Sequence, residues 1–435
     1  MNEISLRNGS RSWLDMSLRD VTVIVVAITM FLSISPFFVW SSFAGGIGGV
    51  IFKGLQLLSI ALMLIHLPIR NMSQSKFVCG LAILVIFFYY CFFTGVESGT
   101  THPLLIGNFL VYFFYALTAM SDRDILVKSF HLLRIIFAAV LSYTIIIHVL
   151  LLLRIPIPYV TLQSGEAGRV AAGQQVYQNY LGCLLIRSNG VLMYRFTSVF
   201  TEPGVVGTFC AFFLAADDCN ISKNKQNKLF LISGILSLSL AFFVMVIIAF
   251  ALKSLRKGGY KLFVGLMAIL VFYFVFININ FSSPGLSALQ DRLVITEDGL
   301  AGDNRISEEA EKEYQAFLNG DLETLLFGYG YPKVDPRTGI SKWQSAATYK
   351  ESVYCLGVLG YLMLLAWFII TPLYCYRSDD PRKNRLMYSF MTIFIISQYQ
   401  RPYMKSLFLV YILLAGCLYA QQSTSDSSEA PELSN

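Results

Sequence analysis

The chain has 435 residues, of which 55% are hydrophobic and 14% charged, and its mean hydropathy is +0.60. Because soluble domains carry about 25% charged residues, this composition excludes an ordinary soluble enzyme, a disordered protein and a DNA-binding protein. The net charge of +6 is typical of a membrane protein with basic cytoplasmic loops and does not indicate nucleic acid as a partner. The cysteines and histidines show no zinc spacing or disulfide framework, and no cofactor is expected.

Long apolar runs dominate the chain, and a membrane-spanning helix needs about 20 such residues. The pattern predicts an all-α polytopic membrane protein with about ten full transmembrane helices. The predicted spans lie near residues 21–41, 49–66, 78–96, 103–120, 132–154, 203–218, 261–280, 352–375, 386–400 and 404–420.

Lysine and arginine gather before the first span and in every second connection, which predicts that these segments face the cytoplasm. Residues 1–20 are then a cytoplasmic N-terminus, and residues 21–420 form one transmembrane domain. Two long connections, 155–202 and 281–350, are predicted on the outer face, where they have room for water-exposed chemistry. The Ser- and Glu-rich residues 421–435 are predicted to be a disordered cytoplasmic tail.

The apolar run 229–252 has basic residues at both ends, so both ends are predicted to be cytoplasmic. A re-entrant helical hairpin that turns near Ser237–Ser239 satisfies both ends. Such a turn requires that protein or a wet cavity surrounds it. One straight helix, which would violate the charge rule, is the alternative.

The segment from Tyr194 to Gly207 closes the first outer connection and opens a span. Thr201 or Glu202 can cap the helix, Pro203 suits its first position, and Gly207 permits close approach of another group. Arg195 lies at the membrane surface, where a guanidinium near a helix N-terminus can bind a diphosphate. The alternative is that Arg195 contacts lipid headgroups and Glu202 only caps the helix.

The second outer connection contains Arg292 and Arg305, followed by an amphipathic helical pattern over 306–318. Next comes the turn 325–332, in which glycines alternate with aromatic residues. We expect the glycines to give a tight turn that holds rings such as Tyr329 apart to meet sugar faces, although core packing or an interfacial aromatic belt is an equal alternative.

Three further residues lie where the chain returns to the membrane. Tyr349 and Lys350 end the second connection and can face the same cavity, while Arg401 lies between the last two spans. Arg401 can join a diphosphate site or bind a headgroup. Because the second connection is acidic overall, any diphosphate site must depend on a few well-placed arginines rather than on the general field.

The pattern R-x-x-x-x-F-x-E-P-x-x-x-G at the outer end of a mid-chain span resembles the bacterial O-antigen polymerase (Wzy) and O-antigen ligase-like membrane protein family. The Leu326–Gly330 turn and the following glycine-rich span resemble the second outer loop of the same family. The resemblance covers the stretch from Arg195 to Tyr361, whereas the first 150 residues resemble the family only in hydropathy.

The resemblance implies a metal-independent glycosyltransferase of the bacterial inner membrane with undecaprenyl-diphosphate-linked oligosaccharides as substrates and a chain-length regulator as a possible partner. It implies transfer of the growing glycan to a new lipid-linked unit at the periplasmic face. The catalytic candidates are Arg195, Glu202 and Arg305. The substrate-binding candidates are Arg292, Tyr329, Tyr349, Lys350 and Arg401.

Two other functions remain as alternatives. O-antigen ligases carry a histidine near the end of the second large outer loop, whereas this chain has no histidine after His148, which favours a polymerase. A flippase of lipid-linked sugars usually has repeated halves, and no such duplication is visible here. The sugar, its linkage, and the choice between O-antigen and another surface polysaccharide cannot be inferred from the sequence.

Overall fold

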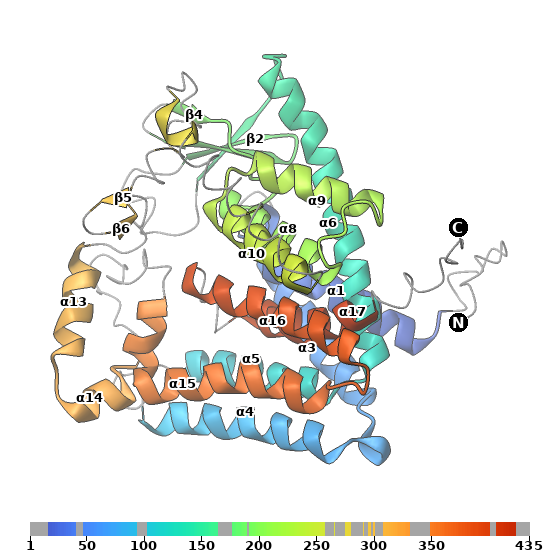
Figure 1. Cartoon of the computed structure of the whole chain (residues 1–435), viewed down its shortest axis with the longest axis vertical. Coiled ribbons are helices and arrows are strands. Elements are labelled where there is room, and N and C mark those ends of the chain that lie inside the picture. The colour runs from blue at the N-terminus through green and yellow to red at the C-terminus, as the bar shows by residue number, and fades with distance from the viewer. Residues whose placement is uncertain are drawn as a thin grey trace.

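The computed structural model is mainly helical (Figure 1). It describes residues 16–40, 47–93, 102–163, 176–188, 191–256, 265, 275–279, 290, 295–296, 299–300, 308–330, 349–400 and 406–422. The helices before the first long connection are α1 (Leu18–Ser33), α2 (Phe37–Trp40), α3 (Ile47–Ile65), the short 3-10 helix η3 (Ile69–Asn71), α4 (Gln74–Phe93), α5 (His102–Met120) and α6 (Arg123–Leu152). Those after it are α8 (Pro203–Ala216), α9 (Lys225–Leu236), α10 (Leu240–Arg256), α13 (Glu308–Leu318), α14 (Leu322–Phe327), α15 (Tyr349–Cys375), α16 (Pro381–Gln400) and α17 (Leu407–Gln422).

Four helices in the described part of the chain are long and apolar enough to cross a membrane: α3, the first 18 residues of α4, α6 and α15. The predicted membrane class is therefore supported, but the count of about ten spans is not confirmed. Helix α8, with 14 residues, is shorter than the bilayer core requires, and the predicted span 261–280 lies mostly outside the described residues.

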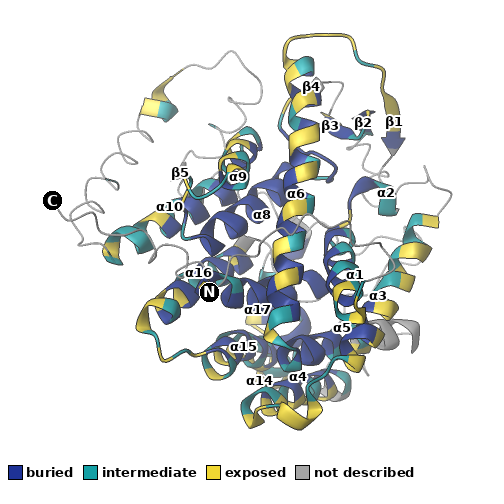
Figure 2. Cartoon of the chain, turned by 90° about the vertical axis from the view of Figure 1, so that its right-hand side faces the viewer, coloured by how far each residue is buried: buried dark blue, intermediate teal, exposed yellow. Residues whose placement is uncertain are grey.

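The core is centred on α8 and α17, which appear dark blue in Figure 2. Every residue of α8 is buried, and α8 packs against α9, α10, α16 and α17. Aromatic rings fill the space between these helices; the Phe137 ring lies 5.2 Å from Phe209 and 5.5 Å from Phe200. This burial explains why the run that follows Pro203 is almost entirely apolar.

A small antiparallel sheet, absent from the sequence prediction, lies within the first long connection. Its strands follow chain order: β1 (Val160–Gln163), β2 (Val176–Tyr180), β3 (Cys183–Ser188) and β4 (Val191–Met193). Leu181 and Gly182, both with positive φ, form the two-residue turn between β2 and β3, as the twist of a hairpin requires. Two-residue strands β5 (Ile295–Thr296) and β6 (Gly299–Leu300) pair in the second connection.

The connections that were predicted to be cytoplasmic lie together. Lys76 donates a hydrogen bond to the carbonyl of Ser121 (2.7 Å), and Arg123 donates one to Gln421 (3.0 Å). Arg19, at the start of α1, forms an ion pair with Asp122 at 2.7 Å. The first turns of α1, α4 and α6 and the end of α17 therefore share one face of the molecule.

The described parts of both long connections lie away from that face. In Figure 1 the sheet is at the top, and α13 and α14 are at the left. The amide of Phe37 donates to the carbonyl of Val199 (2.9 Å), and the rings of Tyr89 and Phe327 are 6.3 Å apart. The alternation predicted from loop charge thus agrees with which helix ends lie together. Helix α17 also includes Gln421, which is fully buried, so the described helix extends into the predicted tail.

Candidate functional site

Arg195 lies at a break between two helices. The run 229–252 is not one straight helix, because α9 ends at Leu236 and α10 begins at Leu240. Leu238 has a φ of 48° in the turn between them, so the predicted break at Ser237–Ser239 is confirmed. Whether the pair re-enters a bilayer remains a prediction.

The guanidinium of Arg195 donates hydrogen bonds to the carbonyl oxygens of Ser237 (3.4 Å) and Leu238 (3.0 Å). The next amide, that of Phe196, donates to the carbonyl of Leu236 at 3.2 Å. Carbonyls at a helix end lack intrahelical partners and carry partial negative charge. Arg195 therefore stabilises the end of α9 while it remains half-buried.

The N-terminus of α8 lies close to this break. Glu202 occupies the N-cap position and Pro203 the first helical position, as predicted, but the Glu202 side chain makes no capping hydrogen bond. A Cβ atom on Gly207 would lie 2.6 Å from the Cβ of Ser239 and 3.0 Å from that of Phe242. The close approach predicted at Gly207 is thus made by the first turn of α10.

The start of α8, the start of α10 and Arg195 consequently meet on the face that carries both long connections. Helix N-termini and a guanidinium all favour negative charge. Glu202, the N-cap residue of α8, is half-buried. Chemically, this arrangement can stabilise an anionic group and offers one carboxylate to accept a proton.

A buried polar layer beneath Arg195 was not predicted from the sequence. The hydroxyl groups of Thr144 and Ser198 lie 2.9 Å apart, and Thr197 donates to the carbonyl of Leu184. The ring of His148, which is 1% exposed, packs edge-on against Phe196 at 5.2 Å. These contacts fix the segment that carries Arg195 to α6 and to the sheet.

The glycine–aromatic turn of the second connection inserts into a break in α15. The amides of Tyr329 and Gly330 donate to the carbonyls of Tyr354 (2.9 Å) and Cys355 (3.0 Å). Gly357 has non-helical angles (φ 69°, ψ 169°) inside α15. The turn therefore satisfies carbonyls that the break leaves without helical partners, and the glycines permit the backbones to meet.

Tyr329, in the glycine–aromatic turn, packs against rings from α13 and α15. Tyr329 lies 5.0 Å from the Tyr354 ring and 5.9 Å from Phe317, yet it remains 49% exposed. The Tyr349 ring stacks on that of Tyr399, at 5.6 Å and 27°. Aromatic faces of this kind can pack against sugar rings, but these also bury part of their surface against each other.

Helix α13 confirms the predicted amphipathic helix from Glu308 onward, and it buries Ala310, Tyr314 and Phe317. Lys350 binds both carboxylate oxygens of Glu311, at 2.7 and 2.8 Å. Partial burial would raise the pKa of Glu311, but the hydrogen bonds from Lys350 and Gln315 outweigh it and hold that pKa below its usual value. Lys350 therefore ties α13 to the start of α15.

Three predicted site residues, Arg292, Arg305 and Arg401, lie outside the described residues. Of the predicted site residues that the structure describes, Tyr329, Tyr349 and Lys350 gather around α13 and the start of α15. Arg195 lies at the turn between α9 and α10, and Glu202 lies at the start of α8. Among the described residues, no group of three or more histidine, cysteine, aspartate or glutamate side chains is arranged to hold a metal ion.

A buried ionic cluster at the other end of α8 was also missed by sequence reasoning. Arg134 and Asp217, both fully buried, form a salt bridge, and Arg134 also donates to Asn227 at 2.8 Å. Lys223 donates to the second carboxylate oxygen of Asp217 at 2.9 Å. The signal available in the sequence was an arginine within an apolar run, since such charges are rare in membrane spans.

Comparison of the chain with protein-family models, with curated proteins and with solved structures finds no match.

Proposed function

We propose that this chain is a metal-independent polymerase of lipid-linked oligosaccharide repeat units in a bacterial inner membrane. In the proposed reaction, a hydroxyl group of a new lipid-linked unit attacks the anomeric carbon of the growing glycan. The carbon–oxygen bond to the lipid diphosphate breaks, the diphosphate leaves with the bonding electrons, and the hydroxyl proton is released. The negative charge therefore develops on the leaving group.

One observation carries the proposal: the guanidinium of half-buried Arg195 is fixed at the turn before α10, and the start of α10 packs against α8 at Gly207. A fixed guanidinium next to two helix N-termini can stabilise a departing diphosphate. Glu202, the half-buried N-cap residue of α8, is the carboxylate of the same pattern and is proposed as the proton acceptor. The Wzy-like pattern that contains both residues supports the same assignment.

The test is replacement of Arg195 by alanine and by lysine in cells whose surface polysaccharide depends on this chain. We expect Arg195→Ala to lower polymerisation by about 100-fold or more and to leave single repeat units on a gel. Arg195→Lys should keep part of the ladder if the positive charge matters most. Full-length ladders from Arg195→Ala would discard the site assignment.

Arg187→Ala is a matched control, because Arg187 is an exposed arginine on β3 of the same outer segment. It should leave the ladder unchanged. Thermal unfolding of the purified variants separates a role in the site from the stabilisation of α9. If the loss of the ladder in each Arg195 variant is proportional to the fall in its unfolding midpoint, Arg195 has only a structural role.

A further inference from the structure

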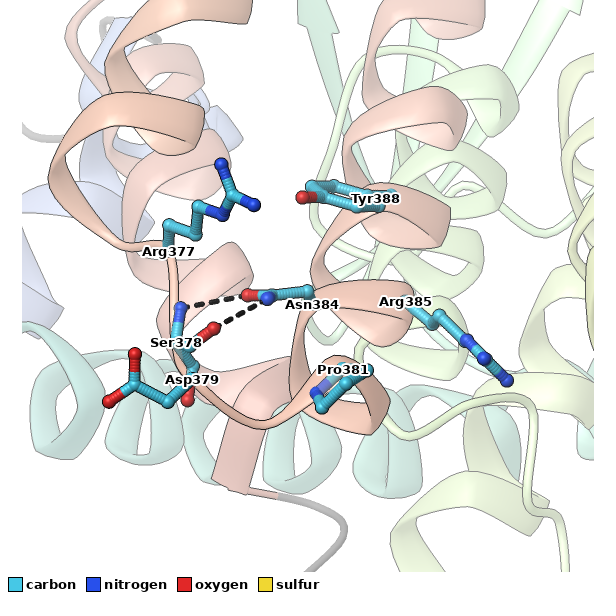
Figure 3. A pocket seen from close by; sticks show the side chains of 7 residues that line it. All are labelled: Arg377, Ser378, Asp379, Pro381, Asn384, Arg385 and Tyr388. Atoms are coloured by element: carbon cyan, nitrogen blue, oxygen red, sulfur yellow. Dashed lines mark hydrogen bonds between the residues drawn. The ribbon is translucent and has the colours of Figure 1, made fainter.

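An open hollow lies between the end of α15 and the start of α16, on the face opposite the long connections (Figure 3). Its volume is about 430 Å³. The lining residues come from one short connection and from the first two turns of α16. They are Arg377, Ser378, Asp379, Pro381, Asn384, Arg385 and Tyr388.

The connection that forms this hollow is held in shape by its own hydrogen bonds. The buried Asn384 side chain accepts from the amide of Ser378 (2.8 Å) and donates to the carbonyl of the same residue (2.6 Å). The carboxylate of Asp380 accepts from the amide of Arg382 at 2.8 Å. The hollow is therefore preorganised and does not require a ligand to order it.

The charge around the hollow favours an anion. Arg377 and Arg385 line it and are exposed, and within the described part of the chain neither forms an ion pair. In Figure 3 the Arg377 side chain reaches toward Tyr388, whereas the carboxylate of Asp379 and the guanidinium of Arg385 both point away from it. Arg382 and Lys383 add positive charge in the first turn of α16 but do not line the hollow.

An apolar stripe leads along α15 to the hollow. Leu359, Leu362, Ile370 and Tyr374 are 39%, 52%, 54% and 57% exposed, and they recur at helical spacing on one side of α15. Arg377 follows Tyr374 by three residues. Tyr388, 37% exposed, extends the aromatic edge from α16. An exposed apolar stripe of this kind on a membrane-spanning helix faces lipid chains.

We propose that this hollow binds the phosphate headgroup of an anionic phospholipid whose acyl chains lie along the exposed stripe of α15. Arg377 contacts the phosphate and Arg385 adds positive charge at the rim, since basic pockets between membrane helices recognise such headgroups. The stripe supplies the apolar contact that a free phosphate ion would not use. This site is separate from the Arg195 region, so it does not depend on the proposed polymerase activity.

The test uses the purified full chain in neutral detergent, with phosphatidylglycerol as the probe and the thermal unfolding midpoint as the readout. Phosphatidylglycerol should raise the midpoint in a saturable way, because a ligand that binds only the folded state stabilises it. Phosphatidylcholine should not. The Arg377→Gln/Arg385→Gln variant should need at least ten times more phosphatidylglycerol for half of the effect.

The Arg382→Gln/Lys383→Gln variant is the matched control, because it removes two positive charges from the first turn of α16 without changing a residue that lines the hollow. It should respond like the unmodified chain. Equal loss in both variants would show that only bulk charge matters and would overturn the proposal. An equal response to inorganic phosphate alone, or no response to phosphatidylglycerol, would also overturn it. The Arg377→Lys/Arg385→Lys variant keeps the charge and should retain part of the response. That result would show that substitution at these positions does not by itself prevent folding or binding.

Discussion

Gly357 shows how a single residue determines a tertiary contact. Its φ of 69° lies in the region that favours glycine. A Cβ atom there would lie 2.1 Å from the carbonyl oxygen of Leu326 and 2.6 Å from the amide nitrogen of Gly328. The sequence indicated only that this span is rich in glycine, because the partner backbone comes from a distant turn.

We therefore expect Gly357→Ala to destabilise the protein by at least about 2 kcal/mol, from backbone strain and a steric clash. Gly54→Ala in α3 is the control, since nothing lies within 4 Å of the added carbon there and alanine favours helix. The measurement is the thermal unfolding midpoint in detergent. Equal midpoints for the two variants would contradict the interlock of residues 326–330 with α15.

At the same scale, the sequence predicted that Arg195 lies near a helix N-terminus, and the structure adds the carbonyls that it binds. Glu202 occupies the N-cap position, as predicted, but its side chain does not form a capping hydrogen bond. Sequence patterns locate a cap because backbone geometry is local, but the hydrogen bond of a side chain depends on which neighbours compete for it.

At the scale of elements, α9 and α10 show what a polar interruption in an apolar run can predict. Basic flanks and the serines at 237 and 239 predicted the turn, which the structure confirms. The sequence did not reveal that α9 and α10 both pack mainly on α8 rather than on each other. It also did not predict the four-stranded sheet, whose short strands lack a long alternating pattern.

The Arg134–Asp217 salt bridge joins α6 to the end of α8, while Asn227 extends it to α9. Arg134→Met should lower the free energy of unfolding by about 3–5 kcal/mol, because removal of one partner leaves a buried charge. Lys128→Ala, which breaks the exposed Lys128–Asp124 pair, should change it by less than about 1 kcal/mol.

Denaturant unfolding of the two variants, followed by circular dichroism, measures this difference. Similar small changes in both would show that the buried pair contributes little. The comparison is matched in type, since each variant removes one cation from an ion pair of α6.

At the scale of the whole molecule, the helix ends lie on two faces, and the charge pattern assigns the more basic face to the cytoplasm. We expect a membrane-impermeant maleimide to label Val160→Cys and Asn319→Cys in cells whose outer barrier is permeable to it. Ser73→Cys and Asp379→Cys should be labelled only after the inner membrane is opened. All four positions are exposed.

The unmodified chain is the control for this labelling, because its described cysteines are buried or half-buried. Labelling of Ser73→Cys before the membrane is opened would reverse the orientation. Opposite results for Val160→Cys and Asn319→Cys would place the two long connections on different faces and remove the basis of the proposed site.

The sequence by itself determined the membrane class, the approximate position of most helices, the break in 229–252 and the buried face of α13. These features follow from local hydrophobicity, charge and helical periodicity, which a one-dimensional pattern records. Only the tertiary structure decided that residues 326–330 insert into α15, that Arg134 meets Asp217, and that the ends of α8 and α10 lie together beside Arg195. Such contacts join segments far apart in the chain, and their geometry depends on how all the surrounding helices pack.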